Sequence, residues 1–242
     1  MDEKERIVAE VTRRAAQIPE GFYALDRPAN KFIYRRYTRE ARALIDRAGL
    51  RPMRDLRVLE IGCGHGQWLV EFRSWGVASC NLCGIDLDAP HVLQARQRLP
   101  EADLRVGDAA CLPWADGEFD VVIQSTVFTS ILDPGMRSAV AREMVRVLRS
   151  PGVILWYDFV YDNPRNPHVR GIGLREMLKL FPGLAPRYRR VTLAPPLARR
   201  IVPISETLAK MLYSMPFLRT HIVATLQRSG STAPNAHAAG PR

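Results

Sequence analysis

A glycine-rich turn close to residue 60 carries the strongest chemical signal in the sequence. Residues 58–66 read VLEIGCGHG, so an apolar run leads into Gly62, Gly64 and Gly66 and then into a helical segment. Glycine lets the backbone pass close to a ligand, because no Cβ stands in the way. The helix that follows directs free N–H groups and the positive end of its dipole to the same place. The turn therefore predicts a nucleotide-like ligand, although glycine spacing alone does not say which one.

Glu60 narrows the choice of ligand. It lies within the end of the apolar run, beside the turn, where a negative charge would oppose a pyrophosphate. A carboxylate there suits a ligand that bears a cationic amino group instead. An NAD-dependent dehydrogenase is therefore disfavoured.

Further polar residues follow the next apolar runs. NLCGID (81–86) ends in Asp86, 20 residues after Gly66, where such folds hydrogen-bond ribose hydroxyls. VGDA (106–109) places Asp108 where it could accept from an adenine amino group. FDVVIQ (119–124) ends in Gln124 and opens into the loop 125–130.

Alternating helices and strands must position these residues. Helical spacing or caps predict helices at 2–17, 31–48, 66–75, 89–99, 136–149, 173–181 and 204–213. Short apolar runs predict strands at 56–61, 82–86, 103–106, 119–124, 153–160, 187–193 and 218–227. Strands alternating with helices predict an α/β fold, with a mostly parallel sheet covered on both faces.

We expect three parts along the chain. Residues 1–50 form an N-terminal helical lid or cap, and residues 51–228 form the core. Within the core, 161–184 is rich in Pro, Asn, Gly and Arg and reads as an acceptor-side insertion, since ligand-contacting loops follow strands in open α/β sheets. The tail 229–242 lacks periodicity and is expected to be disordered.

Composition and charge set further limits. The 242 residues are 47% hydrophobic and 25% charged, which excludes a collagen-like or disulfide-rich chain. We find no apolar run long enough for a membrane span and no secretion signal, which favours the cytoplasm. Residues 135–242 hold 17 basic and 5 acidic side chains, whereas residues 1–134 hold 18 and 20. The basic half suggests nucleic acid, an anionic membrane or an anionic substrate, unless it reflects background arginine usage.

The order of these signals resembles class I S-adenosylmethionine-dependent methyltransferases. LEIGCGHG, GIDLD, VGDAACLPWADGEFDVVIQS and EMVRVLR followed by a strand carry the resemblance, which covers residues 56–160. The nearest type is the small-molecule group that includes quinone-biosynthesis and sugar or natural-product methyltransferases. The resemblance implies a Rossmann-like sheet of seven strands whose last strand is antiparallel. One departure is Arg149-Ser-Pro-Gly152, where the family often has Lys-Pro-Gly-Gly.

The resemblance also implies roles for individual residues. S-Adenosylmethionine is the expected cofactor and S-adenosylhomocysteine the product. The implied cofactor-binding residues are Glu60, Gly62, Gly64, Asp86, Leu87, Asp108, Ala109, Gln124 and Phe128.

The acceptor side offers weaker candidates. His168, in the loop after the strand at 153–160, and Asp158, near that strand's end, are candidate catalytic residues. Tyr23, Arg165 and Arg170 are candidate substrate contacts, and the two arginines suit a phosphate or carboxylate. Each has a plainer interpretation as a surface or packing residue.

No metal site is expected. Cys80 and Cys83 have CxxC spacing, but Cys83 falls within a predicted buried strand, where a free thiol behaves as a small hydrophobe. Cys63 and Cys111 do not form the second pair that a zinc site requires.

The sequence therefore predicts a methyltransferase that acts on a small molecule, with a hydroxyl of a sugar or another biosynthetic intermediate as the expected acceptor. Carbon and nitrogen acceptors stay open. One alternative is an RNA methyltransferase, which the basic half favours and the missing Asn/Asp-Pro-Pro-Tyr motif opposes. Another is a cofactor-binding protein without catalysis. The expected partner is a small anionic acceptor molecule rather than nucleic acid. The sequence leaves open whether the chain forms a homodimer.

Overall fold

A seven-stranded sheet forms the centre of the molecule. The computed structural model describes residues 2–19, 21–164 and 166–228. The strands are β1 (Val58–Ile61), β2 (Leu82–Asp86), β3 (Asp103–Val106), β4 (Phe119–Ser125), β5 (Leu148–Phe159), β6 (Leu184–Leu193) and β7 (Arg219–Arg228). Their order is β3-β2-β1-β4-β5-β7-β6, and β7 runs in the opposite direction to the other six strands. The predicted seven-stranded, mostly parallel sheet with an antiparallel last strand is confirmed.

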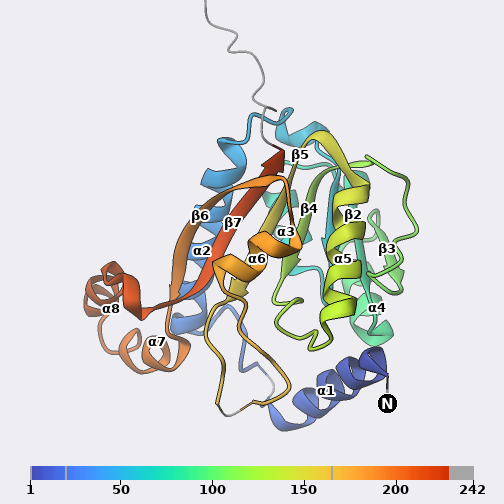
Figure 1. Cartoon of the computed structure of the whole chain (residues 1–242). Helices are drawn as coiled ribbons and strands as arrows, with labels where there is room; N and C mark the ends of the chain where they lie inside the picture. The colour runs from blue at the N-terminus through green and yellow to red at the C-terminus, as the bar shows by residue number, and fades with distance from the viewer. Residues whose placement is uncertain (1, 20, 165, 229–242) are drawn as a thin grey trace, which may run out of the picture.

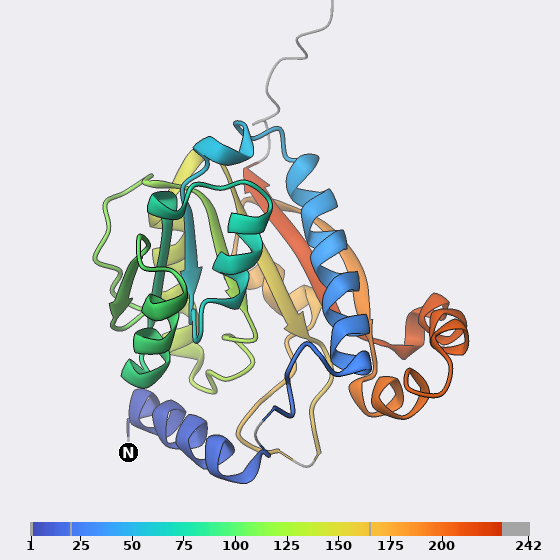
Figure 2. The ribbon, with the colours of Figure 1, turned by 180° about the vertical axis from the view of Figure 1, so that it is seen from behind.

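Helices cover both faces of this sheet (Figures 1 and 2). They are α1 (Glu3–Gln17), α2 (Pro28–Asp46), α3 (Gln67–Ser74), α4 (Ala89–Arg98), α5 (Pro134–Val147), α6 (Leu174–Leu180), α7 (Pro195–Ile201) and α8 (Glu206–Ser214). Short 3-10 turns occur at Met53–Asp55, Ser79–Asn81 and Pro216–Leu218. Helices α2, α3 and α4 cover one face, and α5 and α6 cover the other (Figures 1 and 2).

The strand sequences explain this two-sided burial. All four residues of β1 are buried, as expected for a central parallel strand with helices on both sides. Leu59 and Ile61 pack in the core beneath α5, whereas Val58 packs beneath α2 and α3. Because side chains alternate across a strand, Glu60 is directed to the α3 side as well.

The segment 1–50 is divided between two positions. Helix α2 packs on β6 and β7 and contributes Ala41, Leu44 and Ile45 to the core. Helix α1 instead lies across the carboxyl ends of the parallel strands (Figure 2). Only α1 therefore occupies the position of a lid, while α2 belongs to the layer that covers the sheet.

Two elements differ from the sequence-based expectation. Helix α5 begins at Pro134, and the Asp133 side chain caps it by accepting the N–H of Met136, so the helix starts and ends earlier than predicted. Helix α7 was not predicted; it begins with two prolines, which fit the first turn of a helix. Helices α7 and α8 are inserted between β6 and β7 at the edge of the sheet (Figure 1).

The expected disordered tail, 229–242, lies outside the described residues.

Among the described residues, no helix combines the length and apolarity needed to cross a membrane.

Candidate active site

A cavity of about 180 Å³ lies at the carboxyl ends of the parallel strands. This edge is where open α/β sheets bind ligands. Most of the wall comes from the strand ends and the turns after them, and α1 and α5 complete it. The lining residues are Ile7, Val11, Gly62, Ile85, Asp86, Leu87, Gly107, Ala109, Ser125, Thr126, Val127, Ser130, Ile131, Met136 and Val140.

The glycine turn has backbone conformations that strongly favour glycine. Gly62, Gly64 and Gly66 have φ values of 63°, 48° and 71°, in the left-handed region that L side chains rarely adopt. A Cβ at Gly62 would also lie 2.5 Å from Cγ2 of Val127, on the turn after β4. The close approach of these two turns requires a glycine at position 62.

Asp86 connects the glycine turn to the end of β2. Its Oδ2 accepts the N–H of Gly64 at 2.8 Å, and its Oδ1 accepts the N–H of Asp88 at 2.9 Å. These bonds fix the carboxylate on the wall of the cavity, and each oxygen keeps a lone pair for a further donor. The arrangement fits the two adjacent hydroxyls of a ribose.

Asp108 is held at the next strand end, after β3. Its Oδ1 accepts the N–H of Ala110 at 2.8 Å, and its Oδ2 lies 3.3 Å from Nζ of Lys4 on α1. Ala109, beside it, lines the cavity. The oxygen that the resemblance assigns to an adenine amine is therefore occupied by a cation from the lid helix.

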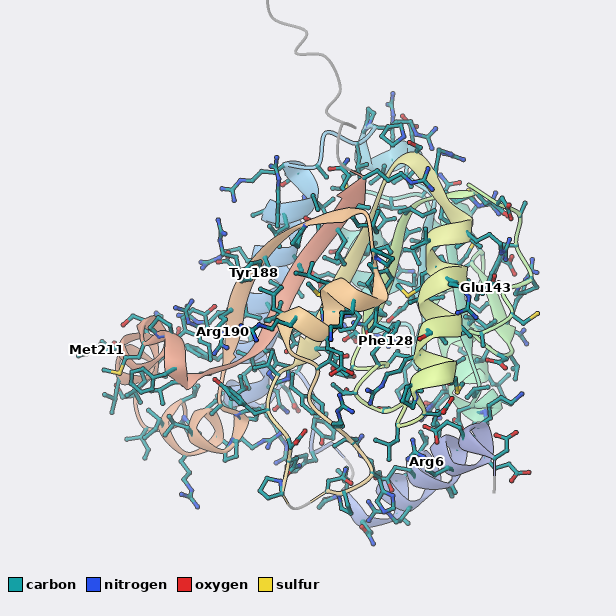
Figure 3. All side chains as sticks on the ribbon, viewed as in Figure 1. Arg6, Phe128, Glu143, Tyr188, Arg190 and Met211 are labelled. Atoms are coloured by element: carbon teal, nitrogen blue, oxygen red, sulfur yellow. The ribbon has the colours of Figure 1, made fainter. Side chains whose placement is uncertain are left out.

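Two residues near the start of α1 anchor it over the cavity. The Arg6 guanidinium binds the Glu3 carboxylate at 2.8 Å and donates to the carbonyl of Ser130 at 2.5 Å (Figure 3). Glu3 in turn accepts the N–H of Leu132 at 2.5 Å. These contacts lower the pKa of Glu3, first because of its hydrogen bond with Arg6. They hold Ile7 and Val11 over the cavity as an apolar roof.

Glu60 lies behind the glycine turn rather than in the cavity wall. Its side chain is buried, and burial raises its pKa well above the ordinary value. One carboxylate oxygen accepts the N–H of Leu69, whereas Oε2 has no partner among the described residues. An unpaired buried carboxylate oxygen is costly, so it suits a cationic group bound close by.

Asp158 and Gln124 support the turn after β4. Both side chains are fully buried. Asp158 accepts the N–H of Thr129 at 3.3 Å, and Gln124 Oε1 accepts the N–H of Val127 at 3.1 Å. Burial raises the pKa of Asp158 to about 7, against the effect of its hydrogen bonds from Thr129 and Phe159. Neither side chain lines the cavity, but both hold the segment that does.

Phe128 is a correction to the predicted site. It was expected beside the cofactor, yet its ring is fully buried against Trp156 and Phe181, at centroid distances of 4.8 and 6.0 Å. This apolar cluster lies under α6, on the opposite side of the turn from the cavity wall. The neighbouring Val127 lines the cavity in its place.

The acceptor-side candidates lie outside the cavity wall. Nε2 of His168 is 3.9 Å from the carboxylate of Glu10 on α1, and Asn166 accepts the His168 N–H. Arg170 binds the Glu176 carboxylate at 2.5 Å. Tyr23 is 55% exposed, and Arg165 lies outside the described residues.

The sequence patterns missed most of the apolar wall. Ile7 and Val11 were recognised as one face of a helix, but nothing local shows what that face covers. Met136 and Val140 likewise follow the helical spacing of α5 and gave no separate signal. Thr126, also on the wall, has a φ of 59°, which only the three-dimensional turn after β4 imposes.

Among the described residues, no group of three or more His, Cys, Asp and Glu side chains could hold a metal ion. Cys80 and Cys83 do not pair; Cys83 is buried and Cys80 is exposed.

The strand order and the cavity at the carboxyl edge define a Rossmann-like fold of the class I methyltransferase type. Comparison with known proteins agrees. The family described as "Methyltransferase domain" matches residues 58–152. Residues 58–152 therefore correspond to a methyltransferase domain, and this part of the chain is similar to S-adenosylmethionine-dependent methyltransferases.

Individual relatives show how far this likeness extends. A probable S-adenosylmethionine-dependent methyltransferase of Mycolicibacterium smegmatis is 32% identical over 132 residues, which is 51% of this chain and 49% of the relative. Phthiotriol/phenolphthiotriol dimycocerosates methyltransferase 1 of Mycobacterium ulcerans is 38% identical over 109 residues, 44% of this chain and 39% of the relative. The chain thus spans about half the length, or less, of these curated relatives.

A solved structure with the same fold covers more of the chain. It is geranyl diphosphate C-methyltransferase from Streptomyces coelicolor, in complex with Mg²⁺, geranyl diphosphate and S-adenosyl-L-homocysteine. The TM-score is 0.63 at 17% identity, over 94% of this chain and 99% of that one. At this identity the likeness concerns the fold alone.

The raised pKa of Asp158 predicts a pH-dependent stability. Its pKa is about 7 in the folded protein and has an ordinary value of 3.8. Between these values the folded state binds more protons than the unfolded state, so stability falls as the pH rises. The comparison is between the wild type and Asp158→Asn as the pH rises from about 4.5 to about 8. Over this range the free energy of unfolding of the wild type should fall by on the order of 1–3 kcal/mol more than that of Asp158→Asn.

Urea unfolding of both proteins at several pH values measures this difference. Glu60 is present in both, so its own contribution cancels in the comparison. If the free energy of unfolding changed with pH in the same way in both proteins, the pKa of Asp158 would not be raised in the folded protein.

Proposed function

We propose that the protein transfers a methyl group from S-adenosylmethionine to a small-molecule acceptor, at a hydroxyl of a sugar or another biosynthetic intermediate. One observation carries this proposal: the cavity under α1 gathers the Gly62 backbone, the Asp86 carboxylate and Ala109 at one place. The names of relatives are consistent with a small acceptor, since they refer to phthiotriol dimycocerosates and to geranyl diphosphate.

Each part of the cofactor has matching residues in this proposal. Asp86 accepts the ribose hydroxyls, and Leu87 packs against the adenine. Gly62 and Gly64 allow the methionine part to lie against the backbone, with Glu60 offering negative charge to its amino group. When bound, S-adenosylmethionine supplies an electrophilic methyl group on a sulfonium.

For the adenine end, the proposal requires Asp108 to exchange one partner. Lys4 lies 3.3 Å from Asp108 Oδ2, on a side chain that is half exposed. An exposed pair of this kind contributes little to stability, so an adenine amine could replace the lysine at small cost. Ile7 and Val11 would then exclude water from the cavity without a polar contact.

His168 is the proposed general base for a hydroxyl acceptor. Its imidazole is 43% exposed and faces Glu10, whose side chain is only 8% exposed. A buried carboxylate next to an imidazole stabilises the imidazolium that forms when the base takes a proton. Asp158 is the other candidate, but because it is buried beneath the turn it would act by positioning Thr129 and its neighbours.

The charge near the acceptor loop supports an anionic acceptor. Glu176 accepts from Arg137 at 2.8 Å and from Arg170 at 2.5 Å, so two guanidinium groups share one carboxylate. Arg137 is buried, and its Nη2 has no partner among the described residues. An excess positive charge with a free donor suits a phosphate or carboxylate on the acceptor.

Asp86→Ala should weaken the binding of S-adenosylhomocysteine by about 10- to 100-fold, because two hydrogen bonds to a charged acceptor are lost. Isothermal titration calorimetry measures this change. Asp116→Ala removes an equally acidic side chain that is 80% exposed and distant in the fold from the cavity, and should bind like the wild type. An intact protein that does not bind S-adenosylhomocysteine would refute the cofactor assignment.

A screen with methyl-labelled S-adenosylmethionine tests the acceptor class. We expect the label in small molecules that carry a hydroxyl and a negative charge, with no transfer by Asp86→Ala. Label in RNA would instead establish the RNA methyltransferase alternative. Tight S-adenosylhomocysteine binding without any transfer, across acceptors and RNA, would favour a non-catalytic cofactor-binding protein.

His168→Ala should lower kcat by roughly 100-fold or more with an acceptor found in that screen, because a general base contributes this much. S-Adenosylhomocysteine binding should stay unchanged, which separates catalysis from cofactor binding. Glu10→Gln should lower kcat in the same direction and shift the pH profile. An unchanged kcat in His168→Ala would leave His168 as a contact of the lid helix only.

A further inference from the structure

Helix α8 and the turn that follows it carry an exposed apolar surface that the methyltransferase site does not use. Five large apolar side chains lie within 14 residues, and their exposed fractions are high. They are Ile204 (81%), Leu208 (41%), Met211 (61%), Met215 (41%) and Phe217 (70%). We call these five residues the outer face.

The outer face is not needed for internal packing. The opposite side of α7 and α8 forms a small core of its own, in which Ala209 and Val202 pack against Phe32 of α2. The spacing of Leu208, Met211 and Met215 places them along one stripe of the helix, away from this core. Figure 3 shows Met211 at the outer tip of the helical pair, directed away from the body of the protein. Exposed apolar side chains grouped in this way mark a surface for binding.

Positive charge surrounds the outer face. Residues 184–228 contain eight basic residues and a single acidic one, Glu206. Arg200 and Lys210 lie within the inserted helices, and both are exposed. Arg35 and Arg36 of α2 lie near enough to act on Glu206, whose pKa is lowered first by its ion pair with Lys210.

The exposed edge strand continues this basic surface. Arg187, Tyr188 and Arg189 of β6 are exposed, and β6 ends where α7 begins. Figure 3 places Tyr188 and Arg190 along the strand that leads to the inserted helices. Exposed basic residues therefore precede the apolar tip along the strand that leads to it.

From this combination we propose that the outer face docks on an anionic lipid bilayer. The exposed apolar side chains would enter the acyl boundary, while the flanking arginines and Lys210 would meet negative headgroups. Unbranched Met side chains suit a fluid phase better than a shaped protein pocket. A second copy of the chain is a poorer occupant, because two equally basic surfaces would face each other.

Docking here would place a bilayer on the side of the molecule where the candidate site opens. Strand β6 runs parallel to β1, β4 and β5, so the inserted helices follow the same edge of the sheet as the cavity (Figure 1). The proposal does not depend on the identity of the acceptor.

Flotation of the full chain with lipid vesicles tests the proposal. Vesicles of phosphatidylcholine alone are compared with vesicles of phosphatidylcholine and an equal amount of phosphatidylglycerol. We expect binding to the anionic vesicles and about tenfold or greater loss of partitioning in Met211→Ser/Phe217→Ser. Leu93→Ser, which changes a 59% exposed leucine on α4, should bind like the wild type.

A second pair of measurements makes the result decisive. S-Adenosylhomocysteine binding and thermal unfolding should be the same in the wild type and in Met211→Ser/Phe217→Ser, since these side chains lie outside the packed core. Arg200→Gln/Lys210→Gln should weaken binding to the anionic vesicles only. Failure of the wild type to bind anionic vesicles, or equal binding by Met211→Ser/Phe217→Ser, would overturn the proposal. A wild-type dimer that this variant dissociates, without vesicle binding, would identify the face as an interface between copies.

Discussion

The close approach of two turns, after β1 and after β4, is the constraint on which the candidate site depends. Gly62 and Val127 lie so near that any Cβ at position 62 would overlap the valine side chain. The same glycine turn is tied to β2, because the Gly64 N–H binds Asp86. Three neighbouring strand ends are thus fixed relative to one another, and the cavity wall follows from their positions.

Buried carboxyl groups support this arrangement from behind. Glu60 is directed to the α3 side of β1, and Asp158 lies on the opposite face of the sheet, beneath the turn after β4. Burial beneath the helices raises the pKa of both carboxyl groups. Neither lines the cavity, but Asp158 holds the turn after β4, which does.

The lid helix is attached mainly by polar contacts to loops, whereas its apolar side chains face the cavity. Arg6 and Glu3 bind backbone groups of the segment 130–132, and Glu10 faces His168. The roof of the cavity and the loop that carries His168 are therefore joined through one short helix. This attachment couples the two halves of the proposed reaction, because movement of α1 would alter the cofactor cavity and the surroundings of His168 together.

Local patterns were sufficient for the alternation of strands and helices and for the acids at the strand ends. A glycine turn, Asp86 and Asp108 each follow an apolar run, and parallel strands must bring such ends to one edge. The mostly parallel sheet follows from these patterns, whereas the antiparallel last strand and the methyltransferase class were implied by the resemblance to a known family. Helix α7 was missed, because its two prolines read as a break rather than as the start of a helix.

The sequence by itself predicted the fold class, and its resemblance to a known family indicated the cofactor. It also singled out Gly62, Asp86 and Ala109, which line the cavity. Only the tertiary structure decided that Phe128 packs in the core, that Ile7 and Val11 roof the cavity, and that Lys4 meets Asp108. The physical reason is the range of the interactions. Turn geometry and strand alternation act between near neighbours in the chain, whereas the partner of a helix face or of a buried ring depends on residues that are distant in sequence.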